Sequence, residues 1–191
     1  MAQPLLDVLS PGNGPGGGDA WLPLDECRDR VPPALVPWLE EPGLLTARVR
    51  SACGAATRLR LLRLEPARMD PAIARRLSVE DHACLLREIE FTCGARRWIF
   101  AQSVFPQSTV RQHPWLRDIS DKSLGEALSV VEDVRREQLE YLELHDGHPL
   151  AQSAGAAAPA GPIWARRAVY RLGGWPILVQ EVFLPALGHC D

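Results

Sequence analysis

A carboxylate occurs within an apolar row of residues near the C-terminus. Residues 175–184 alternate in character, and successive side chains along a strand point to opposite faces. One face of this predicted strand carries Ile177, Val179, Glu181 and Phe183. Because burying a carboxylate without a partner costs free energy, Glu181 is expected to meet either a structural cation or a ligand.

An arginine stands in an equivalent position on a second predicted strand, residues 83–93. One face carries Leu85, Arg87, Ile89 and Phe91. The other carries Leu86, Glu88, Glu90 and Thr92, and we expect it to face solvent. Arg87 and Glu181 are therefore two opposite charges that both point toward the core. A buried pair is one explanation, but such pairs rarely add stability; we favour a site in which the arginine holds a carboxylate and the glutamate a hydroxyl of one small ligand.

Tight turns set the register of the strands that carry these two residues. Gly173-Gly174 separates two alternating runs and predicts a two-residue hairpin. This register places Arg166 opposite Glu181, so Arg166 is a possible structural partner of that carboxylate. Gly94-Ala95 predicts a second hairpin, with Gln102 opposite Arg87.

Four segments in this order resemble chorismate pyruvate-lyase: LLREIEF, RRWIFAQSVFP, SLGEAL and WARRAVYRLGGWPILVQEVFLPA. The resemblance extends from about Trp38 to Pro185, with a gap near Ala151–Gly161. It implies a carbon–oxygen lyase that eliminates pyruvate from chorismate to give 4-hydroxybenzoate, the first committed step toward ubiquinone, without a cofactor. It also implies an α+β fold with a single antiparallel sheet of about six strands and helices packed on it.

The resemblance assigns ligand contacts to four positions. Arg87 would hold the ring carboxylate and Glu181 the ring hydroxyl, which makes them the expected catalytic residues. Leu45 and Leu124 would bind the substrate through the backbone. Both leucines lie in the first turn of a predicted helix, where amides lack intrahelical partners, although core packing alone would also explain them. Arg166 is left unassigned: it could tune Glu181 or reach the pyruvyl carboxylate.

Composition excludes several other classes of protein. The 191 residues carry a net charge of −3 with a pI near 6.0, which argues against an electrostatic nucleic-acid binder. No apolar run approaches the ~20 residues of a membrane span, and no signal peptide is expected. Five scattered cysteines without a CxxC pair indicate a reduced, cytoplasmic protein with free thiols. We expect a monomer.

The chain divides into a Gly/Pro-rich flexible tail at residues 1–30 and one domain at 31–187, with a loop or disordered insertion near 145–162. Residues 131–144 are ambiguous, because their propensity favours helix while the resemblance implies strand. A short helix is predicted at Pro71–Leu77, within a loop from Pro66 to Ser78. His145 and His148 have no obvious third metal ligand near them in the sequence, so no metal site is predicted.

Two alternatives to the lyase are kept open. The same fold serves as the small-molecule sensor domain of GntR-type regulators, which would make this chain a non-catalytic aromatic-acid-binding module. Fewer than 40 residues precede Trp38, which leaves little room for a winged helix. The other alternative is a structural protein in which Arg87 and Glu181 are only a buried pair.

Overall fold

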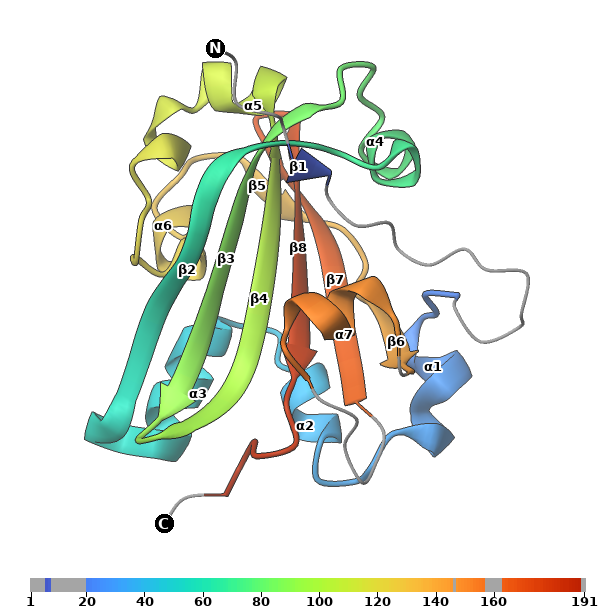
Figure 1. The fold of residues 1–191 in the computed structure, drawn as a ribbon, viewed down its shortest axis with the longest axis vertical. Helices are drawn as coiled ribbons and strands as arrows, with labels where there is room; N and C mark the ends of the chain where they lie inside the picture. The colour runs from blue at the N-terminus through green and yellow to red at the C-terminus, as the bar shows by residue number, and fades with distance from the viewer. Residues whose placement is uncertain (1–5, 8–19, 146, 157–162, 190–191) are drawn as a thin grey trace.

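One curved sheet organises the molecule (Figure 1). The computed structural model describes residues 6–7, 20–145, 147–156 and 163–189. Within them, eight strands lie in the order β1-β2-β3-β4-β8-β7-β5, and β6 pairs with β7. The strands are β1 (Leu6–Asp7), β2 (Thr57–Arg68), β3 (Ala83–Cys93), β4 (Arg96–Pro106), β5 (Val134–Arg136), β6 (Glu140–Leu144), β7 (Ile163–Leu172) and β8 (Trp175–Phe183). All pairings are antiparallel except that of β1 with β2, so the predicted α+β fold with an antiparallel sheet is confirmed.

Short helices connect the strands and cover both faces of the sheet. The α-helices are α1 (Leu24–Cys27), α2 (Val36–Leu39), α3 (Leu45–Cys53), α4 (Pro71–Leu77), α5 (Gln107–Gln112), α6 (Leu124–Leu128) and α7 (Pro149–Ser153). Single 3-10 turns occur at η1 (Arg28–Arg30), η2 (Gly54–Ala56) and η3 (Pro114–Arg117). No helix in the described ranges has the length and apolarity needed to cross a bilayer.

The hairpin of β7 and β8 has the register that the sequence predicts. Leu172 lies opposite Trp175, and Arg166 lies opposite Glu181. Gly173 and Gly174 have φ of 54° and 90°, the left-handed values that a tight primed turn requires. Because the loop has only two residues, this register follows from the local sequence.

The register of β3 with β4 differs from the prediction by one residue. Arg87 lies opposite Ser103, and Gln102 lies opposite Glu88. The pairing shifts between Phe91 and Thr92, which leaves Trp98 as the extra residue of a β-bulge. The expected position of Gln102 opposite Arg87 is therefore wrong, because a turn sets the register only as far as the next bulge.

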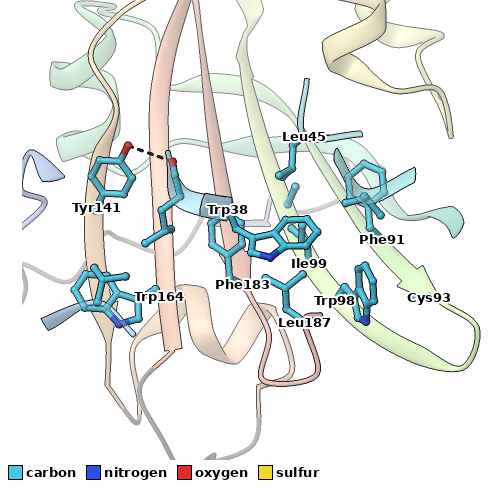
Figure 2. Close-up of a cluster of buried hydrophobic side chains, with 14 of the residues drawn as sticks. Trp38, Leu45, Phe91, Cys93, Trp98, Ile99, Tyr141, Trp164, Phe183 and Leu187 are labelled. Carbon is cyan, nitrogen blue, oxygen red and sulfur yellow. Dashed lines mark hydrogen bonds between the residues drawn. The ribbon is translucent and has the colours of Figure 1, made fainter. Parts of the chain in front are cut away.

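The face of the sheet that carries Arg87 and Glu181, here called the site face, packs against two groups of helices. At one end, α2 and α3 cover a cluster that includes Trp38, Leu45, Phe91, Trp98 and Phe183 (Figure 2). At the other end, α5, η3 and α6 cover a cluster of Phe105, Val110, Leu116, Ile119, Leu124, Leu128, Leu172 and Ile177. The polar residues of the site face lie between these two apolar clusters.

The opposite face is also covered, which contradicts the expectation that Glu88 and Glu90 face solvent. α4 and α7 pack on this face at separate apolar clusters. Glu88 is 7% exposed and Glu90 1% exposed. Gln102 donates to Glu88 over 2.9 Å, and Arg60 lies 2.6 Å from Glu90, so both buried carboxylates have partners. Alternation predicted which side chains share a face, but not that a second layer covers it.

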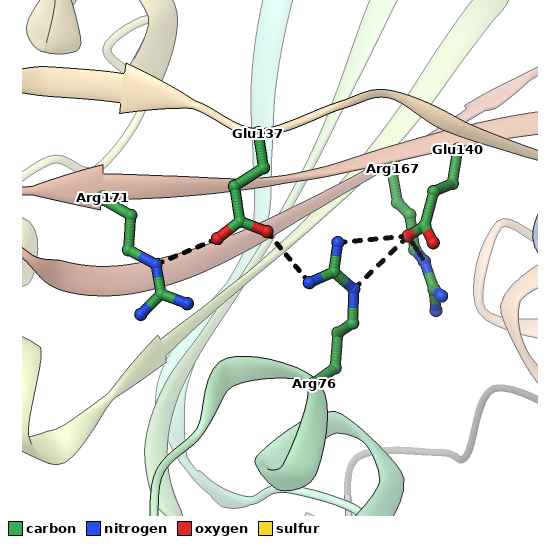
Figure 3. Close-up of polar contacts among 5 residues, drawn as sticks. All are labelled: Arg76, Glu137, Glu140, Arg167 and Arg171. Atoms are coloured by element: carbon green, nitrogen blue, oxygen red, sulfur yellow. Dashed lines mark hydrogen bonds and ion pairs between the residues drawn. The ribbon is translucent and has the colours of Figure 1, made fainter. Parts of the chain in front are cut away.

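Charged side chains join α4 to the far edge of the sheet (Figure 3). Arg76 of α4 contacts Glu137 over 2.9 Å and also reaches Glu140. The two carboxylates in turn accept hydrogen bonds from Arg171 and Arg167, over 3.0 and 2.8 Å. Residues 137 and 140 flank the short connection between β5 and β6, so the ambiguous region 131–144 forms two short strands held by arginines rather than a helix.

Three segments predicted to be irregular contain regular structure. β2 extends to Arg68, through the start of the predicted loop, whereas the helix at Pro71–Leu77 is confirmed. The range 145–162 contains α7, which buries Leu150 and Ala151 against the sheet. The range 1–30 contains β1, α1 and η1, and Cys27 is buried; residues 1–5 and 8–19 of the predicted tail lie outside the described residues.

A disulfide joins Cys53, the last residue of α3, to Cys93, the last residue of β3. Their Cα atoms lie 5.7 Å apart although 40 positions separate them in the chain. Cys27 and Cys84 are buried free thiols. The expectation that the thiols are free is thus wrong for this pair, because helix packing on the sheet edge, and not a spacing motif, brings the two residues together.

Candidate active site

A cavity of about 60 Å³ lies on the site face between the two apolar clusters. Its polar lining residues come from α3, β3, β4, β7 and β8, and they are Thr46, Arg87, Ser103, Arg166, Tyr170 and Glu181. The apolar walls are Leu44, Leu45, Ile89, Phe91, Ala101, Leu124, Leu128 and Val179. All four residues that the sequence nominates for substrate contact, Arg87, Glu181, Leu45 and Leu124, therefore line one cavity.

Arg87 is a buried cation, 1% exposed, with backbone acceptors only. Its Nε and Nη2 donate to the carbonyl oxygen of Ser120 over 3.1 and 3.0 Å, and Nη2 also donates to that of Lys122 over 2.6 Å. Burial lowers the pKa of Arg87 to about 10, and the charge of Asp121 opposes this only in part. A guanidinium that is buried without a carboxylate partner provides a strong binding position for an anion.

Glu181 pairs with Arg166 and not with Arg87. Arg166, 3% exposed, donates from Nε to Oε2 of Glu181. Burial acts to lower the pKa of Arg166, but the adjacent Glu181 carboxylate outweighs it and raises that pKa. The predicted pairing of Arg166 with Glu181 is confirmed, and the alternative of an Arg87–Glu181 pair is wrong.

Arg166 also fixes the segment that covers the cavity. Its Nη1 donates to the carbonyl oxygens of Trp38, Leu39 and Glu41 over 3.2, 3.1 and 3.2 Å. These residues lead into Gly43 and Leu44, which line the cavity. One side chain thus connects the carboxylate of Glu181 to the loop between α2 and α3.

Leu45 and Leu124 are the first residues of α3 and α6. The predicted cap of α6 is confirmed, since the amide of Glu126 donates to Oγ of Ser123 over 3.2 Å. The same Ser123 hydroxyl lies 2.8 Å from Oγ1 of Thr46, which joins the beginnings of the two helices. The structure therefore brings both predicted backbone positions to the same wall of the cavity.

A wider cleft of about 660 Å³ adjoins the cavity and opens to solvent. The two share Gly43, Leu44, Gly125, Leu128 and Tyr170 as lining residues. The contact between Leu44 and Gly125 is tight, because a Cβ atom on Gly125 would lie 2.9 Å from Cδ2 of Leu44. Leu44 and Gly125 therefore lie close together where the cavity adjoins the cleft.

Three polar lining residues were not singled out from the sequence. Ser103 and Tyr170 could have been, because alternation places them on the same face as Arg87 and Glu181 once the register is known. Burial, followed by repulsion from Glu181, raises the pKa of Tyr170. Thr46 carries no such signal, since helix α3 meets the cavity only in the folded chain.

The histidines considered for metal binding lie elsewhere. His148 caps α7, where its Nδ1 accepts from the amide of Leu150 over 3.1 Å. Among the described residues, no group of three or more histidine, cysteine, aspartate or glutamate side chains is placed to hold a metal ion.

The fold and the site define an α+β domain with a polar cavity on one face of its antiparallel sheet. Solved structures with the same fold include the effector domain of PhnF from Mycobacterium smegmatis, at a TM-score of 0.54 and 16% identity over 75% of this chain and 89% of that one. The C-terminal domain of a histidine utilization repressor from Pseudomonas syringae matches at a TM-score of 0.52 and 10% identity, over 71% of this chain and 96% of that one. At such identities the likeness concerns the fold alone.

The chain belongs to the chorismate lyase family, whose family model, described as "Chorismate lyase", matches residues 19–188. A relative from Methylococcus capsulatus is 35% identical over 152 residues, which is 78% of this chain and 94% of the relative. One from Azoarcus sp. is 36% identical over 184 residues, 91% of this chain and 94% of the relative. Both carry the name "Probable chorismate pyruvate-lyase".

Proposed function

We propose that this protein is a chorismate pyruvate-lyase, a carbon–oxygen lyase that forms 4-hydroxybenzoate and pyruvate at the start of ubiquinone biosynthesis. Family membership and relatives over most of the chain support the activity. The observation that carries the proposal is the buried Arg87, which lacks a carboxylate partner and lines the same cavity as Glu181. A small aromatic acid with a para hydroxyl matches this pair of groups.

The reaction needs neither an oxidant nor added water. The bond between the ring carbon and the enolpyruvyl oxygen breaks, the hydrogen on the adjacent hydroxyl-bearing carbon is lost, and the enolpyruvyl group leaves as pyruvate after taking up a proton. Aromatisation of the ring provides the driving force. The protein's main task is to hold a reactive conformer in a dry cavity, and the apolar walls around Arg87 and Glu181 suit that task.

In this proposal Arg87 holds the ring carboxylate. Nε and Nη2 are already engaged with Ser120 and Lys122, so the backbone fixes the guanidinium plane while Nη1 is left for the ligand. Amides at the start of α3 and α6, at Leu45 and Leu124, would supply further donors to the same anion. Because these groups are fixed before the ligand arrives, binding costs little reorganisation.

Glu181 would accept a hydrogen bond from the ring hydroxyl. Arg166 donates to the carboxylate and orients it. Sheet geometry separates this carboxylate from Arg87, because two steps between strands, each of about 4.8 Å, lie between β3 and β8. The separation suits a ligand whose carboxylate and hydroxyl lie at opposite ends of a six-membered ring.

A non-catalytic sensor domain is the second candidate, and the shared fold with effector domains favours it. Incubating the purified protein with chorismate and following 4-hydroxybenzoate by absorbance tests the two. The lyase proposal expects many turnovers per protein molecule. Stoichiometric binding of 4-hydroxybenzoate with no product formed from chorismate would identify the sensor function instead.

The proposal includes a monomeric, cytoplasmic enzyme with its domain at residues 31–187. Large exposed apolar side chains among the described residues are Leu62, Val130 and Trp175. Light scattering, which gives the molar mass in solution, tests the proposed monomeric state. The Cys53–Cys93 disulfide is unusual for a reducing compartment, so the thiol state of the protein recovered from cells under alkylating conditions tests the location.

A further inference from the structure

The cavity contains a second buried arginine, Arg166, whose hydrogen-bonding capacity is not exhausted. Nε is engaged by Glu181 and Nη1 by the three carbonyls of the covering loop. Among the residues that the structure describes, none accepts a hydrogen bond from Nη2. Arg166 is 3% exposed and lines the cavity, so Nη2 belongs to a guanidinium that is desolvated and borders the ligand space.

The cavity holds two arginine side chains, of which the carboxylate of a single aromatic acid needs only one. Arg87 and Arg166 contribute two positive charges and Glu181 one negative charge. Chorismate has two carboxylates, one on the ring and one on the enolpyruvyl group. Arg87 can neutralise only one of them.

Register across the sheet places Arg166 beside Glu181, on the side of the cavity away from Arg87. Glu181 and Arg166 face each other on β8 and β7, and Arg87 lies on β3 beyond β4. In chorismate the enolpyruvyl ether is attached to the ring carbon next to the one that bears the hydroxyl. If Glu181 holds the hydroxyl and Arg87 the ring carboxylate, the enolpyruvyl carboxylate lies on the Glu181 side of the ring.

We propose that Nη2 of Arg166 binds the enolpyruvyl carboxylate, so that the two arginines hold the two carboxylates of the substrate and Glu181 lies between them. This inference rests on the proposed lyase function. Arg166 thereby distinguishes substrate from product, because 4-hydroxybenzoate retains only the carboxylate held by Arg87. Once the carbon–oxygen bond breaks, the group on Arg166 is free to leave as pyruvate.

A matched pair of stable ligands tests, without any mutation, whether the protein binds a second carboxylate. 3-(Carboxymethoxy)-4-hydroxybenzoate carries the second carboxylate, and 3-(carbamoylmethoxy)-4-hydroxybenzoate is its uncharged isostere. The proposal expects calorimetry to show at least tenfold tighter binding of the dicarboxylate by the unmutated protein, which corresponds to about 1.4 kcal/mol. Equal affinities for the two ligands would overturn it.

Variants then assign the preference to one residue. Arg166→Lys keeps a positive charge beside Glu181, but its ammonium cannot serve Glu181, three carbonyls and a ligand together. We expect the preference for the dicarboxylate over its uncharged isostere to fall to within about threefold, whatever the change in the Kd of 4-hydroxybenzoate. Arg87→Lys is the matched control, and it should weaken all three ligands and keep the preference. Equal weakening of every ligand by Arg166→Lys would mean a structural role only.

Arg136 is another arginine that could bind the second carboxylate, because it lines the outer cleft together with Tyr170. If Arg136→Ala loses the preference and Arg166→Lys retains it, the second carboxylate binds in the cleft and the proposal is overturned. Failure of the lyase function gives a different result: the unmutated protein would show no turnover of chorismate, whatever its ligand preference.

Discussion

Arg166 and Glu181 face each other across the β7–β8 hairpin and form an ion pair inside the cavity. The pair has two roles that a sequence pattern could not separate. It neutralises a carboxylate that would otherwise be costly to bury, and it leaves both groups in the wall of a ligand cavity. Arg87, by contrast, has only carbonyl partners, so its positive charge is available to bind an anion.

Arg87→Ala should abolish most activity and leave the fold intact. A charge-assisted contact to a buried anion is worth about 2–4 kcal/mol, so kcat/KM for chorismate should fall roughly 30- to 900-fold. Arg87→Lys should restore little, because one ammonium cannot serve the Ser120 and Lys122 carbonyls and also hold a carboxylate. Arg135→Ala, at an exposed arginine on β5, is the control. Full activity of Arg87→Ala would disprove the assignment.

Glu181→Gln separates catalysis from stability. The amide oxygen can still accept from Nε of Arg166, which also keeps its three carbonyl acceptors, so the free energy of unfolding should fall by only about 1–2 kcal/mol. Turnover should fall at least tenfold, since an uncharged amide is a weaker acceptor for the ring hydroxyl. A thermal melt without ligand and a chorismate assay on one preparation measure both. A large loss of stability with normal turnover by the folded fraction would make the carboxylate purely structural.

The Cys53–Cys93 disulfide should stabilise the fold. It closes a loop of 40 residues, and a loop of that length corresponds to about 4 kcal/mol in the chain-entropy model, with typical measured values of about 2–4 kcal/mol. Urea unfolding of the double variant Cys53→Ser/Cys93→Ser should show this loss. A dithiol reductant should destabilise the unmutated protein by a similar amount and leave the double variant unaffected. Equal sensitivity of both proteins to the reductant would contradict the prediction.

Glu137 should contribute to acid sensitivity. Burial acts to raise its pKa, but the Arg76 and Arg171 guanidiniums outweigh it and hold that pKa below its usual range. A carboxyl whose pKa is lower in the folded state contributes stability above its unfolded pKa and loses it as the pH falls through the folded pKa. The effect should stay under about 1 kcal/mol, because these side chains are roughly one-third exposed. Glu137→Gln should make the melting temperature less dependent on pH between about pH 5 and 3. An unchanged pH profile would contradict the pairing.

Gly125→Ala should narrow the passage between cleft and cavity. The new Cβ atom would press on Leu44, whereas alanine favours the helical backbone of α6 by up to about 1 kcal/mol relative to glycine. We expect kcat/KM for chorismate to fall several-fold while the melting temperature stays level or rises. Unchanged kinetics would show that Leu44 moves aside without cost. Leu44→Ala in the same background should restore the rate.

Local sequence determined the parts of the site that depend on strand alternation and short turns. The Gly173-Gly174 loop fixed Arg166 opposite Glu181, and alternation placed Arg87 and Glu181 on inward faces. The capping residues fixed the start of α6 at Leu124. These predictions succeed because each rests on backbone geometry within a few residues.

Tertiary structure alone decided which groups meet. Cys53 reaches Cys93, Thr46 reaches Ser123, and a bulge at Trp98 shifts the partner of Arg87. Residues 134–136 and 140–144 became strands because β7 offers an open edge and arginines hold the carboxylates of this region, although its propensity favours helix. Periodicity states which way a side chain points, but burial and pairing depend on elements that are distant in the chain and meet only when the sheet and helices pack.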